Sequence, residues 1–129
     1  MKKFTLQHAL SGLKTRLPRL EVLPNNFKSY TITITIPEYS SVCPKTGLPD
    51  TGTITIEYEP GRHFVELKSL KLYILAYRNL GIFYENAVNR IYDDFVKAVK
   101  PRWVIIRGIF NPRGGISTTV EKRFRQKPR

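Results

Sequence analysis

Apolar and polar residues alternate strictly along residues 30–36, where tyrosine or isoleucine fills every second position between threonines. The same alternation returns at residues 53–58. A period of two is typical of a β-strand with one buried face, so both segments predict strands, and the first is expected to end at Pro37. Residues 103–110 and 116–121 predict a second strand pair, joined by a turn.

The apolar period changes to that of a helix between the two strand pairs. Side chains recur at spacings of three and four from Glu66 onward: Leu67, Leu70, Ile74 and Tyr77. Asn79 and Gly81 are expected to stop this helix. A second helix is predicted from about Phe83 to Lys100, just before a proline. Its apolar stripe is expected to comprise Val88, Ile91, Tyr92, Phe95 and Val99.

The resulting order, ββααββ, predicts an α+β fold with an antiparallel four-stranded sheet and two helices on one face. We expect the isoleucine face of the sheet to pack on the helices. The face that carries threonine and glutamate is expected to be free for water or another subunit. The predicted organisation is an N-terminal arm at residues 1–29, one domain at 30–124 and a basic tail at 125–129.

The composition excludes several classes of protein. No apolar run approaches the roughly 18 residues that a membrane span requires, and the N-terminus lacks the apolar core of a secretory signal. Cys43 is the only cysteine, so an internal disulfide and a cysteine-rich zinc site are excluded. We therefore expect a cytoplasmic protein without a metal.

The net charge of +12 is large for 129 residues. It favours polyanionic partners, either a nucleic acid or the phosphates of a cofactor. Much of the excess lies near the two ends of the chain, so solvated basic tails are an equally good interpretation.

The segment at residues 43–50 combines a thiol, two prolines, a glycine and a carboxyl group. Cys43 has two interpretations: a small buried apolar side chain, or a nucleophile held in a stiff loop. Asp50 is either a turn residue or a general acid close to the thiol. A nucleophilic thiol needs local activation, and the sequence shows no Cys–His pair.

Other charged residues also have two interpretations. Lys68 and Lys71 are either a solvated helix face or a phosphate clamp at a helix N-terminus. Arg113, before two glycines, could add a cation on a turn. Glu85 either complements the dipole of the second helix or accepts paired hydrogen bonds from a purine-like ring.

These motifs together resemble the queuosine-pathway nitrile reductases (QueF) in their short, unimodular form. The resemblance extends from about Tyr30 to Val120. It rests on five marks in the family's order: residues 43–50, residues 66–73, residues 77–79, Glu85 and residues 110–115.

The resemblance implies a tunnelling fold whose subunits join into stacked rings, such as a decamer. The implied reaction is the NADPH-dependent reduction of 7-cyano-7-deazaguanine to 7-aminomethyl-7-deazaguanine. Cys43 would form a covalent thioimide with the nitrile carbon, and Asp50 would donate the proton. The deazaguanine would be held by Val65, Glu66, Leu67, Tyr84 and Glu85. The NADPH phosphates would be held by Lys68, Ser69, Lys71 and Arg113.

One departure from the family and three alternatives accompany this prediction. Family members often have histidine where this chain has Tyr84, which cannot titrate near neutrality as histidine does. A relative that forms an amidine on cyano-deazaguanine in tRNA would suit the positive charge. A basic RNA-binding module would explain the charge but not the segment from Cys43 to Asp50. A zinc cyclohydrolase of the same fold lacks its ligands here. The reductase needs no direct tRNA binding, and the charge leaves that binding open.

Overall fold

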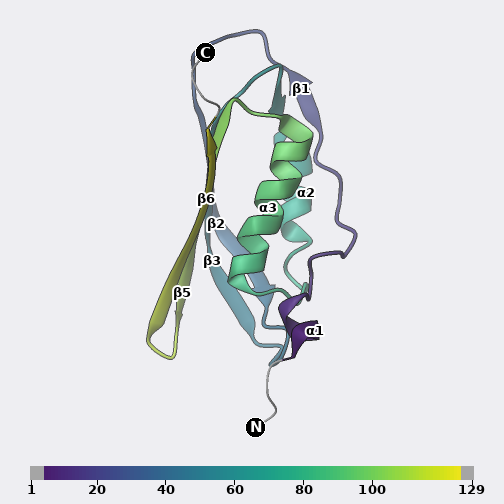
Figure 1. The fold of residues 1–129 in the computed structure, drawn as a ribbon, viewed down its shortest axis with the longest axis vertical. Coiled ribbons are helices and arrows are strands. Elements are labelled where there is room, and N and C mark those ends of the chain that lie inside the picture. Colours follow the sequence, from purple (N-terminus) through teal and green to yellow (C-terminus); the bar gives the residue numbers. More distant parts are fainter. Residues whose placement is uncertain (1–4, 126–129) are drawn as a thin grey trace.

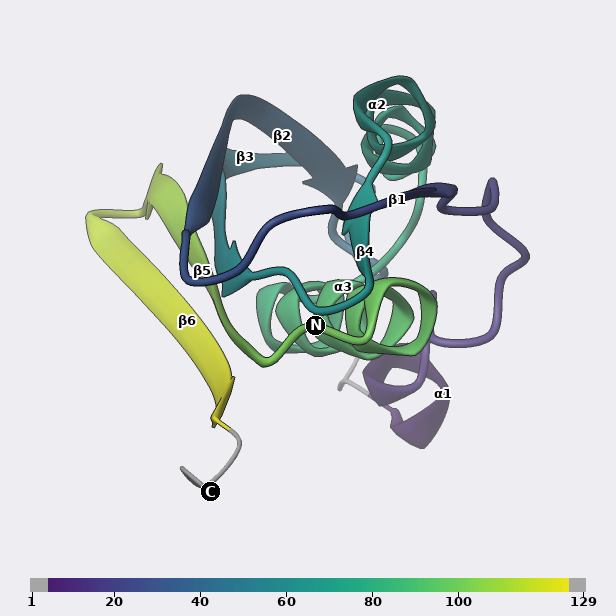
Figure 2. The same cartoon turned by 90° about the horizontal axis from the view of Figure 1, so that it is seen from above.

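The computed structural model describes residues 5–125. Its main sheet is antiparallel, in the order β2 (Ile32–Val42), β3 (Pro49–Glu59), β5 (Trp103–Arg113) and β6 (Ile116–Arg125). Two helices, α2 (Leu67–Leu75) and α3 (Tyr84–Val99), cover one face of this sheet, as Figures 1 and 2 show. This arrangement confirms the predicted ββααββ order and the α+β class.

Strand β2 continues past Pro37, so the prediction that this proline ends the strand is wrong. The pairing register between β2 and β3 shifts between Ile36 and Tyr39, which marks a bulge at the proline. Because β2 is an edge strand, a residue without an N–H group can lie in it without breaking a ladder on both sides. The extra length carries β2 to Val42, directly before Cys43.

The core lies between the helices and the sheet. Ile54, Ile56 and Tyr58 of β3 are completely buried there. Four of the five residues predicted for the apolar stripe of α3 are also fully buried: Val88, Ile91, Phe95 and Val99. Each large side chain taken out of water contributes about 1.5–3 kcal/mol, so this layer fixes how α3 is placed on the sheet.

Helix α2 is shorter than predicted, since it ends at Leu75 rather than at Asn79. Just beyond this end, the backbone N–H groups of Tyr77 and Arg78 bond to carbonyls three residues back, as in a tightened final turn. Tyr77 nevertheless stays buried, as its position in the predicted stripe requires. Helix α3 ends as predicted, with Lys100 in the left-handed region at φ 52°.

The predicted N-terminal arm carries structure of its own within residues 5–29. It forms a short helix, α1 (Leu6–Ala9), and a strand, β1 (Val22–Pro24), that pairs antiparallel with β4 (His63–Val65). At the other end of the chain, residues 126–129 of the predicted basic tail lie outside the described residues.

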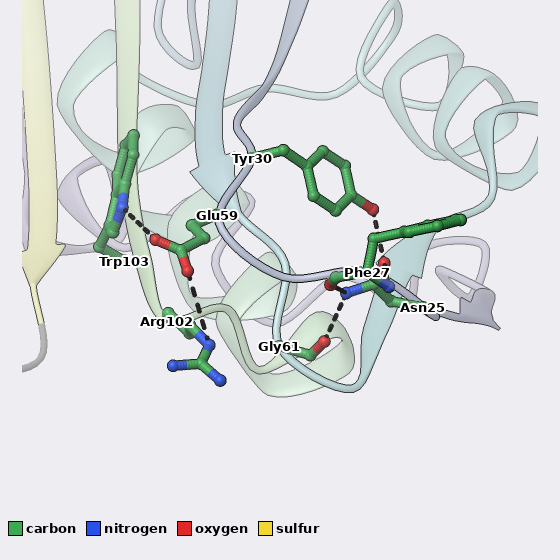
Figure 3. Close-up of polar contacts among 7 residues, drawn as sticks. All are labelled: Asn25, Phe27, Tyr30, Glu59, Gly61, Arg102 and Trp103. Atoms are coloured by element: carbon green, nitrogen blue, oxygen red, sulfur yellow. Dashed lines mark hydrogen bonds and ion pairs between the residues drawn. The ribbon is translucent and has the colours of Figure 1, made fainter.

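Polar contacts hold the arm against the domain at the end where β1 lies. Asn25 donates hydrogen bonds to the carbonyls of Phe27 and Gly61, and the Tyr30 hydroxyl donates to Asn25 at 2.6 Å (Figure 3). Nearby, Glu59 accepts from the indole of Trp103 and pairs with Arg102.

The first part of the arm is held at the opposite end, near the start of α3. The guanidinium of Arg90 donates to the carbonyls of Gly12 and Thr15. The Ser11 hydroxyl donates to the carbonyl of Gly81 at 2.7 Å. Gly12 has φ +81°, and a Cβ there would lie 2.7 Å from the carbonyl oxygen of Gly81, so only glycine fits.

Candidate functional site

Cys43 begins a closed loop between β2 and β3. Its N–H donates to the carbonyl of Leu48, and its carbonyl accepts from the N–H of Gly47, both at 2.9 Å. Gly47 has φ +71°, which glycine adopts without strain. The side chain of Thr46 accepts from the N–H of Leu48 at 3.2 Å. The predicted stiff loop is therefore held together by its own backbone and by one threonine.

The half-buried thiol of Cys43 is polarised by this same loop. Burial acts to raise its pKa, but three hydrogen bonds outweigh burial: one from the Thr46 side chain and two from the backbone N–H groups of Thr46 and Lys45. The net effect lowers the pKa of the thiol, although the charge of Asp50 acts against it. The arrangement resembles a helix N-cap, in which a side chain accepts from N–H groups two and three residues ahead. No histidine is involved in it.

Asp50 lies in β3, not in a turn, because the turn-like sequence after Pro49 is drawn into the ladder with β2. It is directly opposite Ser41 in that ladder, and it is only 4% exposed. One carboxylate oxygen, Oδ1, accepts a hydrogen bond from the Tyr84 hydroxyl at 3.0 Å and pairs with the Arg113 guanidinium at 2.5 Å. The buried charge is thus compensated by a cation and a hydroxyl, as such a group requires.

Tyr84 is placed by stacking as well as by its hydrogen bond. It opens helix α3, and its ring stacks on that of Phe110 with 4.0 Å between centroids and 17° between planes. Burial, followed by the hydrogen bond and charge of Asp50, raises the pKa of Tyr84 to about 12. The phenol is therefore neutral and donates to Asp50. Glu85, the next residue, is exposed on the first turn of α3.

The loop before α3 is joined to the end of β2, which brings Tyr84 to Asp50. Val42 donates its N–H to the carbonyl of Leu80 and accepts from the N–H of Ile82, both at 3.0 Å, and forms a parallel bridge with Gly81. Sequence reasoning did not identify this bridge, the role of Thr46, or the stacking of Phe110. The spacing of three between Cys43 and Thr46 is a capping signal that could have identified the second of these.

The remaining predicted site residues form a second group around the start of α2. Val65 is buried at the end of β4, whereas Leu67, Lys68 and Lys71 are exposed. Helix α2 begins at this group and runs toward the loop that contacts Val42. Each residue of the helix adds about 1.5 Å along its axis. The two groups therefore lie at opposite ends of the fold (Figure 1). A single copy brings Cys43, Asp50, Tyr84 and Arg113 together, but not the residues at the start of α2.

Glu66 caps helix α2 in this structure. Its carboxylate accepts from the N–H groups of Lys68 at 2.8 Å and of Ser69 at 2.7 Å, and these bonds, that of Ser69 first, lower the pKa of Glu66. The Ser69 hydroxyl donates to the Glu66 carbonyl and accepts from the N–H of Glu21. These groups are therefore already hydrogen-bonded. A phosphate at this helix start would depend on the two exposed ammonium groups, of Lys68 and Lys71.

Within residues 5–125, no cluster of three or more histidine, cysteine, aspartate or glutamate side chains could hold a metal ion. None of the helices described there combines the length and the apolar character that crossing a bilayer requires.

Comparison with known proteins gives concordant results. The model of a family described as QueF-like protein matches residues 49–129. A protein of Elusimicrobium minutum (strain Pei191), named NADPH-dependent 7-cyano-7-deazaguanine reductase, is 49% identical over 125 residues, covering 96% of this chain and 95% of its own. A protein of the same name from Chloroherpeton thalassium is 58% identical over 107 residues, covering 81% of this chain and 92% of its own.

The fold also has a counterpart among solved structures. The crystal structure of the archaeosine synthase QueF-Like in the apo form superposes with a TM-score of 0.69. It covers 76% of this chain and 96% of its own at 20% sequence identity. At that identity, the likeness establishes a shared fold and nothing about the reaction.

Proposed function

Because the chain belongs to the QueF-like family, we propose that it catalyses the NADPH-dependent reduction of 7-cyano-7-deazaguanine to 7-aminomethyl-7-deazaguanine in queuosine biosynthesis. One observation carries the proposal: the thiol whose pKa is lowered by its own loop is joined by a short, closed loop to a buried carboxyl group. A thiolate beside an acid is what covalent capture of a nitrile needs. The catalytic unit is the domain at residues 30–124.

The first step is addition of Cys43 across the nitrile. The proton of the thiol passes to the Asp50 carboxylate, the sulfur forms a bond to the nitrile carbon as one π bond of the nitrile breaks, and Asp50 gives that proton to the nitrogen. The product is a covalent thioimide. Since the thiol supplies one proton and the thioimide nitrogen holds one, this step takes up no net proton. Covalent capture divides a difficult reduction into easier steps.

The later steps release the product. NADPH supplies a hydride to the thioimide carbon, and the adduct then expels the Cys43 sulfur to give an imine. A second hydride converts the imine to the amine, so two NADPH and two protons are consumed per nitrile. An imine hydrolyses in water, which favours a closed site. Tyr84 and Glu85, at the start of α3, are proposed to hold the ring, and the hydrogen bond from Tyr84 to Asp50 supports this assignment.

The chain's own residues fit the phosphates of NADPH as point charges. Lys68 and Lys71 are exposed on the first turns of α2, and Arg113 is the exposed last residue of β5, directly before the turn to β6. The buried Ser69 could contribute only by exchanging one of its present hydrogen bonds. We propose that, once the thioimide has formed, Arg113 leaves Asp50 for a phosphate, because Asp50 must then take up protons from solvent for the two reductions.

Two copies of the chain are proposed to complete each site. Val65, Glu66 and Leu67 are assigned to the deazaguanine, yet they lie at the end of β4 and the start of α2, at the opposite end of the fold from the loop after β2 that begins at Cys43 (Figure 1). A ring of subunits could place the start of α2 in one copy beside Cys43 in the next. We propose a homo-oligomer of stacked rings, which is cytoplasmic because Cys43 must stay reduced to act.

The test is mass spectrometry of the intact protein after mixing with 7-cyano-7-deazaguanine in the absence of NADPH. The unaltered protein should gain the mass of one nitrile, and Cys43→Ala should gain none. With NADPH present, absorbance at 340 nm should fall by about two NADPH per nitrile. Turnover by Cys43→Ala would contradict the covalent mechanism. No NADPH oxidation, together with amidine formation on tRNA, would favour the transferase instead.

A further inference from the structure

Three side chains, one on α2, one just beyond its end and one on α3, form a hydrogen-bonded row that the proposed reaction does not use. The Tyr73 hydroxyl donates to Oδ2 of Asp94 at 2.5 Å, and the hydroxyls of Tyr73 and Tyr77 are 2.8 Å apart. Tyr73 has a single hydroxyl proton, which goes to Asp94, so Tyr77 is the donor in the second bond. Both tyrosines are buried, whereas the Asp94 side chain is 36% exposed. The row therefore begins at solvent and leads into the core.

The inner end of this row points toward Asp50. The ring of Tyr77 lies 5.8 Å from that of Tyr39 in β2. Ser41, two residues further on the same face of β2, is directly opposite Asp50. The hydroxyls of Tyr39 and Ser41 are fully buried, and within residues 5–125 neither makes a hydrogen bond of good geometry, although they lie close enough that, against the effect of burial, Ser41 acts to lower the pKa of Tyr39. Buried hydroxyls are nearly always paired, so two adjacent exceptions beside a proposed general acid call for an explanation.

The proposed reaction supplies a reason for such a row. Each of the two reductions consumes one proton from Asp50: the first restores the thiol of the expelled Cys43 sulfur, and the second goes to the substrate nitrogen. Asp50 is only 4% exposed even in a single copy, and a bound nitrile and a second copy would cover it further. A closed site needs a route by which its acid recovers a proton without admitting water.

We propose that Asp94, Tyr73, Tyr77, Tyr39 and Ser41 form a proton path that reloads Asp50 from solvent through the protein core. The path rests on the proposed function, because only a reaction that consumes protons requires it. Its members act through Asp50, so they are positioning residues rather than catalytic ones. The steps from Tyr77 to Tyr39 and from Ser41 to Asp50 are made by rotation of hydroxyl groups or through one bound water.

The transfer conserves protons at every site. A proton from solvent binds Asp94, and Asp94 gives it to the Tyr73 oxygen while Tyr73 passes its own proton to Tyr77. Tyr77 passes one to Tyr39, Tyr39 to Ser41, and Ser41 to Asp50. Each hydroxyl accepts one proton as it gives one, and its O–H bond then rotates back. The structure shows the orientation left after a transfer, in which the Tyr73 proton points toward Asp94, so this O–H bond rotates toward Tyr77 before the next transfer.

The chemistry of the tyrosines requires this concerted form. Burial raises the pKa of Tyr39, Tyr73 and Tyr77 far above the ordinary value, so none of them ionises. A path through a free tyrosinate is therefore excluded, whereas a path through neutral hydroxyls, each both donor and acceptor, is open.

Tyr77→Phe tests the path because it removes the central hydroxyl and keeps the ring. Tyr30→Phe is the matched control. It also removes one tyrosine hydroxyl that makes a short hydrogen bond, to Asn25, at the other end of the fold. Both proteins are compared with the unaltered protein in melting temperature, nitrile adduct formed without NADPH, and kcat in H2O and in D2O.

We expect Tyr77→Phe to form the adduct as fully as the unaltered protein, because that step takes up no net proton. Its kcat should fall about tenfold or more, and its solvent deuterium effect on kcat should rise, because proton supply limits turnover. Tyr30→Phe should leave both kcat and its solvent deuterium effect unchanged. Asp94→Asn, at a partly exposed position, should reproduce the loss of kcat and provides the test if Tyr77→Phe does not fold.

Three results would overturn the path. Unchanged kcat in Tyr77→Phe and in Asp94→Asn would show that no proton passes through them. Loss of the adduct in Tyr77→Phe, or an equal loss of kcat in Tyr30→Phe, would show a purely structural role. Absence of both adduct and turnover in the unaltered protein would contradict the proposed function itself, and the path with it.

Discussion

The guanidinium of Arg113 lies 2.5 Å from Oδ1 of Asp50, so a cation at the exposed end of β5 covers a buried carboxylate. The hydrogen bond to Asp50 raises the pKa of Arg113, so the guanidinium stays positively charged in this contact. Because the same guanidinium is proposed to bind a cofactor phosphate, its two partners compete. Binding of NADPH would release Asp50 at the moment when the reaction needs it.

Removing Arg113 should therefore separate cofactor binding from covalent capture. We expect Arg113→Ala to raise the KM for NADPH about tenfold or more, since a charged hydrogen bond to phosphate is lost. Adduct formation without NADPH should persist. The KM for NADPH of Arg113→Lys should lie between those of Arg113→Ala and the unaltered protein, because an ammonium keeps the charge but not the planar fork. The measurement is steady-state kinetics with NADPH varied; an unchanged KM in Arg113→Ala would contradict the assignment.

Removing the Thr46 hydroxyl should make Cys43 less reactive at neutral pH. The loop lowers the pKa of Cys43, so its thiolate persists to lower pH than that of an ordinary thiol. Thr46→Val removes one of the three stabilising bonds, so the curve of alkylation rate against pH should move to higher pH. The rate at pH 7 should then fall about threefold to tenfold.

Iodoacetamide alkylation, followed by mass spectrometry from pH 5 to 10, is the measurement for Thr46. Thr46→Ser is the control, because it keeps the hydroxyl and should keep the midpoint near that of the unaltered protein. Cys43 is the only cysteine, so the signal is unambiguous. If Thr46→Val and Thr46→Ser gave the same midpoint as the unaltered protein, the backbone alone would account for the lowered pKa.

Substitution of Tyr84 should change the pH profile of the enzyme in a defined way. Its pKa of about 12 keeps the phenol neutral at working pH, so it contributes no ionisation to the profile. Tyr84→His should introduce an ionisation into the pH profile, near the ordinary histidine pKa of about 6.5. Tyr84→Phe should keep the stacking on Phe110, lose the bond to Asp50, and reduce kcat about threefold to tenfold without a new ionisation. A new ionisation in the pH profile of Tyr84→Phe would contradict this account.

Mixing two inactive variants should restore activity if each site draws on two copies. Cys43→Ala lacks the nucleophile, and Lys68→Ala lacks a proposed phosphate ligand at the other end of the fold. In an equal mixture assembled together, about one quarter of the sites would combine both intact groups. Co-expression with two affinity tags, followed by an NADPH assay, measures this. Lys68→Ala mixed with Lys71→Ala is the control and should restore nothing, because both residues come from one copy. No recovery in the first mixture would favour a site within one chain.

The sequence predicted the sheet and the helices well because their periods are local. Burial of Val88, Ile91, Phe95 and Val99 follows from a stripe that any α-helix would present. The course of β2 through Pro37 was not predictable, since it depends on β2 being an edge strand, and that is a property of the whole sheet. The early end of α2 likewise depends on how residues 76–80 meet Val42.

For the site, the sequence identified the chemistry but not the contacts. It marked Cys43 and Asp50 as candidates, yet the ion pair of Asp50 with Arg113 joins residues 63 positions apart. Glu66 and Ser69 were predicted as ligands, and their present bonds to the backbone show that they also form the start of α2. Those bonds depend on atomic positions that residue types alone do not determine.

The attachment of the arm to the start of α3 affects how the chain is made. Ser11 and Gly81 are 70 positions apart, and Asn86 donates to the carbonyl of Ala9 across 77 positions. Residues 9–12 thus leave the ribosome long before the partners that they contact, and loop closure over that distance is slow compared with local helix formation. Until then the segment around Gly12 has no docking surface, so a nascent chain stalled before residue 81 holds an unattached arm, open to proteases and chaperones alike.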